Sequence, residues 1–313
     1  MKYGFGVDLG GTTVKIAYFD QEGTMLHKWE IPTVTSENGS HILPDIAAAI
    51  AGYLAENSIP AEDIIGVGIG VPGPVDKNGV VNKCINLGWG RFNVEAELSA
   101  LTGFPVKAGN DATVAALGEC WKGGGAGYAY IVFITLGTGV GGGIIVDGKP
   151  VYGTRGASGE IGHIVLNKNE SIPCSCGKYG CVEQYCSATG IVRTAKRHLN
   201  LDLRPSILRD VEELTCKAVF DAGASGDAVA GVILDEVYEQ LAEFVGDVCC
   251  VLDPEVVVIG GGVSKAGTVL LEGIRTRLHK YVFHAIRDVE LSLASLGNDA
   301  GAYGAFKLVV DAK

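Results

Sequence analysis

The sequence predicts an α/β protein of two domains in which one order of strands and turns occurs twice. Residues 3–8 are a short apolar run that ends at a Gly/Thr-rich turn, residues 10–13, before a second apolar run at 14–19. Residues 128–136 repeat this order with a Gly-Thr-Gly turn at 137–139 and an apolar return at 142–147. With 313 residues, the chain exceeds the usual size of a single core. Two such halves would naturally face each other across a cleft.

The first half continues as alternating strands and helices. We expect a strand over residues 25–31 after a turn at 21–23, and a helix over 41–57, because its apolar residues recur at helical spacing. Further expected elements are a buried strand at 64–71 that ends at Pro72-Gly73-Pro74, a helix at 94–101, a strand at 106–108 and a helix at 112–121.

The second half is largely helical after its opening hairpin. Residues 229–252 have a long apolar face and predict a helix. A strand at 255–259, the glycine turn 260–262 and a helix from about residue 267 follow, then a strand at 289–293 and a terminal helix at 301–310. We expect a small domain of residues 1–110 plus about 301–313, and a larger one of residues 111–300.

Charge and composition exclude several classes of protein. Hydrophobic residues make up 47 % and charged residues 19 %, which fits a folded chain with a large core. The net charge of −11 argues against nucleic-acid binding. No run approaches the roughly 18 apolar residues of a membrane span, and the sequence enters a strand without a signal peptide. We therefore expect a cytoplasmic protein with mostly reduced cysteines.

Three glycine turns are candidate phosphate-binding or nucleoside-binding loops. Residues 137–142 match G-x-G-x-x-G, but a strand follows instead of a helix, so we reject a dinucleotide-binding fold. The turns at 10–13 and 137–139 would still expose backbone N–H groups and hydroxyls to a phosphate. The turn at 260–262 follows a buried strand and could admit a nucleoside. A tight hairpin without a ligand is the alternative for either Gly/Thr turn alone.

Asp111 is the candidate catalytic carboxylate. It follows a predicted strand and opens a predicted helix beside Asn110. A carboxylate in a cleft could accept the proton of an attacking hydroxyl. The alternative is a helix N-cap, where Asn and Asp are both favoured, and the two roles are compatible.

A histidine and three cysteines form a candidate zinc site. Glu160 and His163 are three residues apart, so they would share a face of a helical turn. Cys174, Cys176 and Cys181 follow within a glycine-containing segment. Three close cysteines and one upstream histidine fit a Cys₃His site better than incidental thiols. The other six cysteines are scattered or apolar-facing, and we expect them to be buried small hydrophobes.

Four motifs in this order resemble the ROK family of sugar kinases and sugar-responsive repressors. They are residues 8–15, 109–112, 159–163 and 174–183, and residues 296–301 extend the likeness, which runs from residue 3 to about 310. Within the family, residues 86–89 and 135–143 are most similar to the bacterial glucokinases. The resemblance implies an actin-like (ribonuclease H-like) duplicated ATPase fold with a cleft between its two domains, the larger carrying a zinc knuckle at 163–181.

The resemblance also implies residue roles. Asp111 would be the general base, and sugar hydroxyls would be held by Asn110, Asp111, Glu160, His163 and Glu183, with Gly73 and Asn86 as weaker candidates. ATP and Mg²⁺ would be held by Asp8, Gly10, Gly11, Thr12, Thr13, Lys15, Thr135, Gly137, Thr138, Gly139, Gly261 and Gly262. Zn²⁺ would be held by His163, Cys174, Cys176 and Cys181. A homodimer is also expected.

The expected activity is ATP-dependent phosphorylation of glucose to glucose 6-phosphate. A kinase for N-acetylmannosamine, N-acetylglucosamine, fructose or allose would use the same catalytic residues, so the motifs leave these sugars open. A sugar-sensing repressor of the family is disfavoured, because only seven residues precede Asp8 and the chain is acidic.

Overall fold

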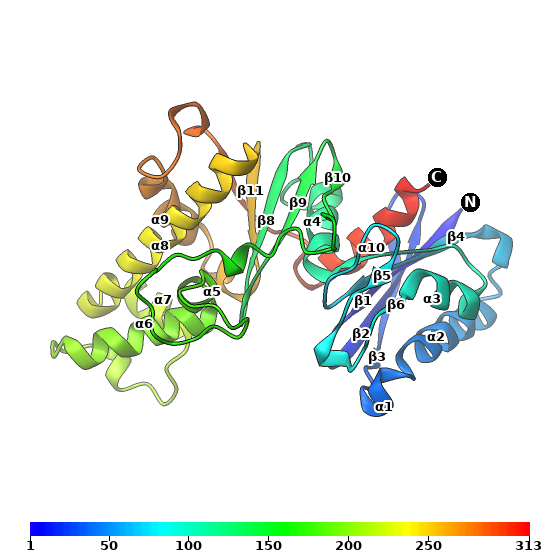
Figure 1. The fold of residues 1–313 in the computed structure, drawn as a ribbon, viewed down its shortest axis with the longest axis horizontal. Helices are drawn as coiled ribbons and strands as arrows, with labels where there is room; N and C mark the ends of the chain where they lie inside the picture. Colours follow the sequence, from blue (N-terminus) through cyan, green and yellow to red (C-terminus); the bar gives the residue numbers. More distant parts are fainter. The chain divides into compact units, whose positions relative to one another are not determined.

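The computed structural model describes all of residues 1–313 and contains two five-stranded sheets (Figure 1). The first has the order β3-β2-β1-β4-β7, and the second β10-β9-β8-β11-β12. The strands of the first sheet are β1 Tyr3–Leu9, β2 Thr13–Asp20, β3 Met25–Pro32, β4 Ile64–Val71 and β7 Val106–Asn110. The strands of the second are β8 Ile131–Leu136, β9 Val140–Val146, β10 Lys149–Pro150, β11 Val256–Gly260 and β12 Glu290–Leu293. The two orders correspond strand for strand, which confirms the predicted duplication.

Strand directions place the important loops at defined sheet edges. β1 pairs antiparallel with β2 and parallel with β4, and β4 pairs parallel with β7. In the second sheet β11 pairs parallel with both β8 and β12. Because parallel strands end at the same edge, loops that follow β4 and β7 are neighbours, as are loops that follow β8 and β11. A strand, β9, follows the turn at 137–139, which confirms that no dinucleotide-binding helix starts there.

The helices account for most of the remaining chain. They are α1 Ser36–Gly39, α2 Ile42–Glu56, α3 Val94–Thr102, α4 Asp111–Lys122, α5 Glu183–Cys186, α6 Ala188–Leu201, α7 Cys216–Ala224, α8 Ala228–Leu252, α9 Thr268–Leu278 and α10 Ala300–Asp311. A two-stranded ribbon, β5 Val80–Val81 and β6 Phe92–Asn93, precedes α3. The helices α5, α6 and α7 were not predicted from the sequence. None of the helices combines the length and apolar character needed to span a bilayer.

The contacts divide the chain into two compact units at places other than the expected boundaries. The first unit is Met1–Ala129, Gly143–Gly159 and Leu296–Lys313, and the second is Tyr130–Gly142 and Glu160–Ser295. The expected boundary after residue 110 separates α4 from the first unit, whereas α4 packs against α10 within that unit. This packing joins segments nearly 200 residues apart, and local patterns do not reveal it.

Alternating glycines let α10 approach the first sheet closely. On β1, Phe5, Val7 and Leu9 are buried in one core with α2 and α3, while Gly4 precedes Phe5 and Gly6 lies between Phe5 and Val7. A Cβ atom on Gly6 would lie 2.0 Å from the carbonyl oxygen of Ala302, and one on Gly68 would lie 1.7 Å from that of Ala305. Helix α10 therefore packs directly against the backbone of the first sheet at these glycines.

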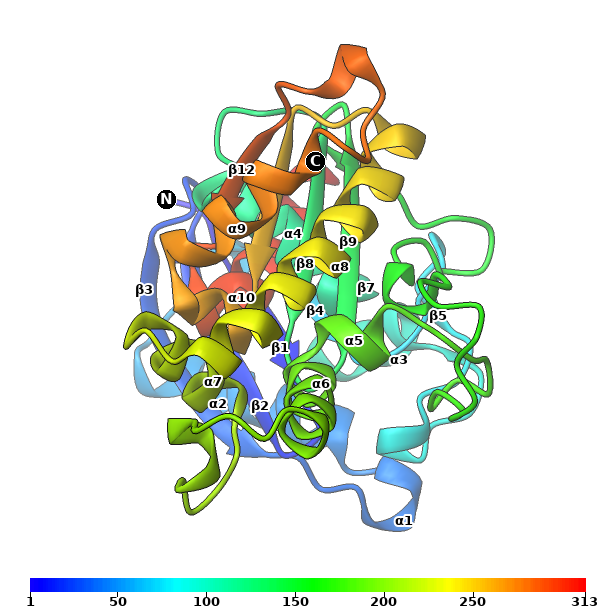
Figure 2. The same cartoon turned by 90° about the vertical axis from the view of Figure 1, so that its left-hand side faces the viewer.

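The second unit has its own core, in which α8 packs on the strands. Buried residues of β8 and β11 share one cluster with α8, α9 and α6. Figure 2 shows α8 and α9 side by side in this unit, in agreement with their direct packing. Caps fix the helix starts: the side chain of Asp227 accepts from the N–H groups of Val229 and Ala230 at the start of α8, and Ser187 Oγ accepts from Gly190 at the start of α6.

We expect Gly304→Ala to lower the free energy of unfolding by about 1–3 kcal/mol, the usual cost of overpacking a core. A Cβ atom on Gly304 of α10 would lie 1.6 Å from the carbonyl oxygen of Val114 on α4. Denaturant unfolding measures the change. Gly52→Ala on α2 is the matched control, because nothing lies within 4 Å of its Cβ position, and there alanine should stabilise the helix by about 0.5–1 kcal/mol. Equal effects at both positions would contradict the packing of α4 on α10.

Candidate functional site

The first Gly/Thr turn joins β1 to β2 and is open at its tip. The N–H of Gly10 donates to the carbonyl of Thr13 at 3.0 Å, which closes the turn, and Thr33 Oγ1 donates to the carbonyl of Gly10 at 2.8 Å. Gly11 and Thr12 are exposed. The structure therefore presents the tip of this turn to solvent, as a phosphate-binding loop requires.

Asp8 lies just before this turn, in a place that disfavours its charge. Its side chain is 22 % exposed, and burial raises its pKa above the ordinary value; Lys15 counters this and Asp299 adds to it. Lys15 faces Asp8 across β1 and β2, with its Nζ 3.8 Å from the carboxylate. Asp299 is itself paired with Lys28 at 2.8 Å. A further cation beside Asp8 would favour its ionised form.

The loops after β4 and β7 bring Gly73, Asn110 and Asp111 together. Val71 is the register partner of Asn110, and Asn110 Nδ2 donates to the carbonyl of Gly73 at 3.1 Å. Asn110 Oδ1 accepts from the N–H of Thr113, so Asn110 is the N-cap of α4. An N-cap role for Asp111 is therefore wrong, because Asp111 is the first helical residue.

Asp111 points an exposed carboxylate out of the first turn of α4. Its Oδ1 accepts from the N–H of Ala112 at 2.8 Å. It also lies close enough to Cys84 to raise the pKa of that thiol, although burial is the larger cause. Asn86 is exposed in the short helical turn Ile85–Leu87 that follows Cys84. The structure thus brings the residue 84–88 loop near Asp111.

In the second unit, two glycine turns share one sheet edge. Gly260 of β11 is the register partner of Thr135 of β8, so the turns at 137–139 and 260–262 are neighbours. Gly261 has a φ of +81°, and a Cβ atom there would lie 2.5 Å from the carbonyl oxygen of Leu136. Only glycine combines this conformation with this approach.

The start of α6 holds the 137–139 turn in place. The N–H of Ala188 donates to the carbonyl of Gly137, and Thr189 Oγ1 donates to that of Thr138, both at 2.8 Å. Thr138 is exposed. This contact was not predicted from the sequence, because it joins segments about 50 residues apart.

His163, Cys174, Cys176 and Cys181 form one cluster. Their ligand atoms all lie within 4.8 Å of one another. The Sγ atoms of Cys176 and Cys181 are 3.7 Å apart, and His163 Nδ1 is 3.8 Å from Cys174 Sγ. A tetrahedral site with Zn–S bonds of about 2.3 Å has sulfur–sulfur distances of roughly 3.8 Å, so the residues fit a zinc ion.

The cluster is adjacent to the candidate sugar residues Glu160, His163 and Glu183. His163 turns its Nε2 toward Glu160 Oε2 at 3.8 Å, while its Nδ1 faces Cys174. Glu183 begins α5; its Oε1 accepts from Ser175 Oγ at 3.2 Å, and its Oε2 accepts from the N–H of Val140 at 3.1 Å. Glu183 therefore connects the cysteine segment to the strand that follows Gly139.

A pocket of about 540 Å³ opens beside Glu183 in the second unit. Glu183 and Arg193 are the charged residues of its lining, and Thr138, Thr189 and Ser175 supply hydroxyls. Ser175 and Arg193 were absent from the sequence prediction. The position of Ser175 between two predicted metal ligands was a signal that could have found it.

The structure thus gathers the predicted residues into two sets. Asp8, Lys15, the 10–13 turn, Gly73, Asn86, Asn110 and Asp111 lie in the first unit. Thr135, the 137–139 and 260–262 turns, Glu160, Glu183 and the cysteine cluster lie in the second. The chain is a duplicated α/β protein, and each of its two sheets carries a glycine turn after its first strand. This is the architecture of the actin-like ATPase folds.

Comparison with known proteins gives the family within this class. The model of the ROK family matches residues 4–312. A glucokinase of Halalkalibacterium halodurans is 41 % identical over 97 % of this chain and 94 % of its own, and one of Thermotoga maritima is 36 % identical over 97 % and 96 %. A ROK family glucokinase from Streptomyces griseus, solved in complex with glucose and AMPPNP, superposes with a TM-score of 0.76 at 33 % identity, covering 98 % of both chains. The chain belongs to the ROK family.

Proposed function

We propose that the chain transfers the γ-phosphoryl group of ATP to the 6-hydroxyl of glucose. The observation that carries the proposal is the carboxylate of Asp111, exposed at the start of α4 while Asn110 caps that helix. The family relatives named glucokinase, and the related structure that holds glucose and AMPPNP, support glucose and ATP as the substrates.

Asp111 is the proposed general base. As the sugar hydroxyl attacks the γ-phosphorus, its proton passes to the carboxylate and the new oxygen–phosphorus bond forms. The bond between the γ-phosphorus and the bridging oxygen breaks, and ADP leaves. Asp111 Oδ1 accepts from the N–H of Ala112, which helps to orient the carboxylate. Water has to be excluded during the transfer, because it competes with the sugar for the same phosphoryl group.

The other sugar hydroxyls are proposed to pair with Asn110, Glu160, His163 and Glu183. A carboxylate accepts two hydroxyl donors, and an amide both donates and accepts, so this set matches a polyol. The carbonyl-lined turn at Gly73, which already accepts from Asn110, and the exposed Asn86 are the weaker candidates. A site that pairs each hydroxyl rejects sugars that lack one, because buried polar groups are then left unpaired.

The glycine turns are proposed to bind ATP. Residues 10–13 and 137–139 offer backbone N–H groups and threonine hydroxyls to phosphates, with Lys15 and Thr135 beside them, and Gly261 and Gly262 leave room for the nucleoside. Bound Mg²⁺ would supply positive charge that stabilises the transferring phosphoryl oxygens. Asp8 fits such an ion, since its carboxylate is partly buried and a cation would offset the cost of its charge.

Zinc is proposed to be structural. His163, Cys174, Cys176 and Cys181 supply four protein ligands, which complete a tetrahedral shell and leave no open position. The ion would hold together the segments that present Glu160, His163 and Glu183.

The proposal also includes a cytoplasmic location and a homodimer. For a homodimer, sedimentation would show twice the 32.6 kDa mass of one chain.

Glucose is expected to have the highest kcat/KM in an ADP-release assay over a panel of hexoses. The panel contains glucose, fructose, allose, N-acetylglucosamine and N-acetylmannosamine, each with ATP and Mg²⁺. The reason is the similarity of the chain to relatives named glucokinase. A site that pairs each hydroxyl of its sugar would also disfavour a sugar in which one hydroxyl is inverted, because one polar group is then left unpaired. A higher kcat/KM for N-acetylmannosamine would refute glucose as the substrate and leave the phosphotransfer chemistry in place.

A further inference from the structure

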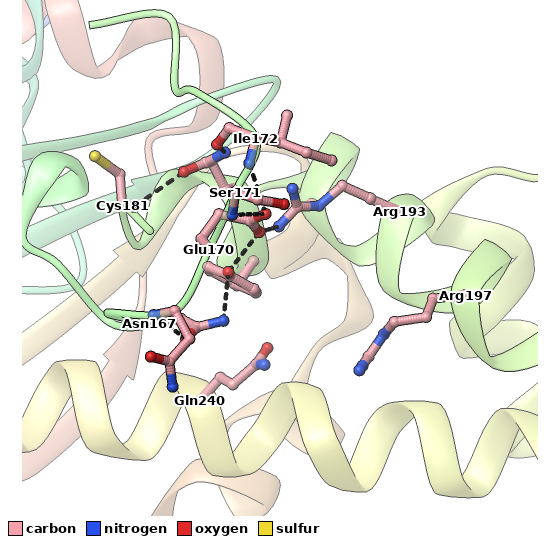
Figure 3. Close-up of polar contacts among 12 residues, drawn as sticks. Asn167, Glu170, Ser171, Ile172, Cys181, Arg193, Arg197 and Gln240 are labelled. Atoms are coloured by element: carbon pink, nitrogen blue, oxygen red, sulfur yellow. Dashed lines mark hydrogen bonds and ion pairs between the residues drawn. The ribbon is translucent and has the colours of Figure 1, made fainter. Parts of the chain in front are cut away.

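Glu170 collects four hydrogen bonds at one carboxylate beside the cysteine cluster (Figure 3). Its Oε1 accepts from the backbone N–H groups of Ser171 and Ile172, both at 3.0 Å. Its Oε2 accepts from the Tyr185 hydroxyl at 2.6 Å and from Arg193 Nη2 at 2.8 Å. The side chain is 12 % exposed. The donors come from the loop itself, from α5 and from α6.

These contacts are reinforced around Glu170. The Arg193 guanidinium lies 4.8 Å from the centroid of the Tyr185 ring, and Asn167 Nδ2 donates to the Tyr185 hydroxyl at 2.9 Å. The Tyr185 hydroxyl and the Ile172 N–H, with Arg193, lower the pKa of Glu170 to about 2. The carboxylate is therefore ionised throughout the physiological range and accepts from all four donors.

A second link runs through Gln184. Its Nε2 donates to the carbonyl of Ile172 at 2.9 Å, and its Oε1 accepts from the N–H of Cys181 at 3.1 Å. The segment from Glu170 to Ile172 is thus fixed to α5 at two adjacent side chains, Gln184 and Tyr185. The next residues along the chain are Pro173, Cys174 and Ser175.

The segment fixed in this way ends at Glu183. Ser175 Oγ donates to Glu183 Oε1 at 3.2 Å, and Cys174 Sγ lies 3.7 Å from the same oxygen. Ile172, Pro173, Cys174, Ser175, Glu183 and Arg193 all line the same pocket. Glu183, Gln184 and Tyr185 belong to one short helix, α5. The contacts of Glu170 and Gln184 therefore fix both the helix that carries Glu183 and the loop that contacts it.

We propose that Glu170 is a positioning residue for sugar binding: with Tyr185 and Arg193 it clamps residues 170–175 against α5 and thereby sets the direction of the Glu183 carboxylate through Ser175. This inference rests on the proposed function of Glu183. Glu170 itself touches no substrate. Its effect is on the affinity for sugar, whereas the phosphate-binding turns are held by other contacts, such as that of Thr189 with Thr138.

The test is Glu170→Gln. A glutamine keeps the shape but has one accepting oxygen, so its NH₂ group must face either the two backbone donors or Tyr185 and Arg193. We expect the KM for glucose to rise about tenfold, the typical consequence of losing a charge-assisted hydrogen bond, with kcat and the KM for ATP within about twofold of wild type. Zinc content should remain that of the wild type.

Matched variants separate positioning from general loosening. Asp202→Asn removes a carboxylate of equally low pKa, about 2, that is paired with Arg204 beyond the end of α6; its glucose KM should equal that of the wild type. Ser175→Ala should raise the glucose KM as Glu170→Gln does. If Glu170→Gln does not fold, Tyr185→Phe removes one donor and keeps the ring, and it should raise the same KM by a smaller factor.

Hydrogen exchange provides a readout that does not depend on sugar turnover. In Glu170→Gln, the amides of Ser171 and Ile172 should exchange at least about tenfold faster than in the wild type, because their acceptor is weakened. An unchanged glucose KM, an equal rise of the KM values for glucose and ATP, or unchanged exchange would overturn the proposal. A wild-type enzyme that releases no ADP with glucose would refute the proposed function instead. In that case the exchange rates alone would show whether Glu170 fixes residues 170–175 against α5.

Discussion

Replacing Asp111 with asparagine is expected to lower kcat by about 10²–10⁴-fold, the usual contribution of general-base catalysis. The fold and the Kd for glucose should stay close to those of the wild type. Asn110 caps α4, and an asparagine at 111 can still accept from the N–H of Ala112, so the helix start is retained. What is lost is the ability to take a proton. Steady-state ADP release and calorimetric glucose binding measure the two effects.

Asp45→Asn is the matched control for this variant. Asp45 is also an aspartate in the first turn of a helix of the first unit, α2, and its loss should leave kcat unchanged. An Asp111→Asn enzyme that kept more than about a tenth of wild-type kcat would show that Asp111 is not the base. The result would then point to a role in the first turn of α4 alone.

Replacing Cys181 with serine is expected to remove zinc and to raise the KM for sugar by about 10–100-fold, the range found when support of a metal site is lost. Cys181 is fully buried, and its Sγ atom lies 3.7 Å from Cys176 Sγ. Without the ion, the segments that carry His163 and Ser175 lose their common anchor. The KM for ATP should change much less. Metal analysis and steady-state kinetics give the two values.

Two further variants complete this test. Cys176 is exposed, so Cys176→Ser removes a ligand with less risk to the core, and it should reproduce the loss of zinc. Cys250→Ser removes an exposed thiol of the same unit outside the cluster and should change neither value. Wild-type protein without zinc, or a Cys181→Ser enzyme with unchanged sugar KM, would contradict the structural role of the ion.

The parts of the fold that local patterns predicted are those with strong periodicity. The glycine-turned hairpins, α8 and α10 are within a few residues of their expected bounds. α6 was missed although Ile191 and Ala195 are buried one turn apart and Ser187 caps its start, so a signal was present. The boundaries of the units were not accessible locally, because the packing of α4 on α10 depends on close approach at Gly118 and Gly304.

The residues of the candidate site also fall into those that contiguous motifs predicted and those that only the fold brings together. Turns and metal ligands are contiguous in sequence and were predicted as groups, and the four atoms of the cysteine cluster do meet. An N-cap was the alternative role considered for Asp111, because Asn and Asp are both good caps. The structure shows that Asn110 is the cap, since α4 begins at Asp111. Glu170 and Arg193 carry no motif; they meet because α5 and α6 bring their segments together.

The most direct measurement is the identity of the phosphorylated product. Phosphorus NMR of a reaction with ATP, Mg²⁺ and glucose should show ADP and glucose 6-phosphate appearing in equal amounts, with no matching release of inorganic phosphate. In the same assay 6-deoxyglucose, which lacks the accepting hydroxyl, should give no sugar phosphate. The account would be contradicted by ADP that appears with inorganic phosphate alone, by a product phosphorylated at another hydroxyl, or by the absence of any conversion of glucose.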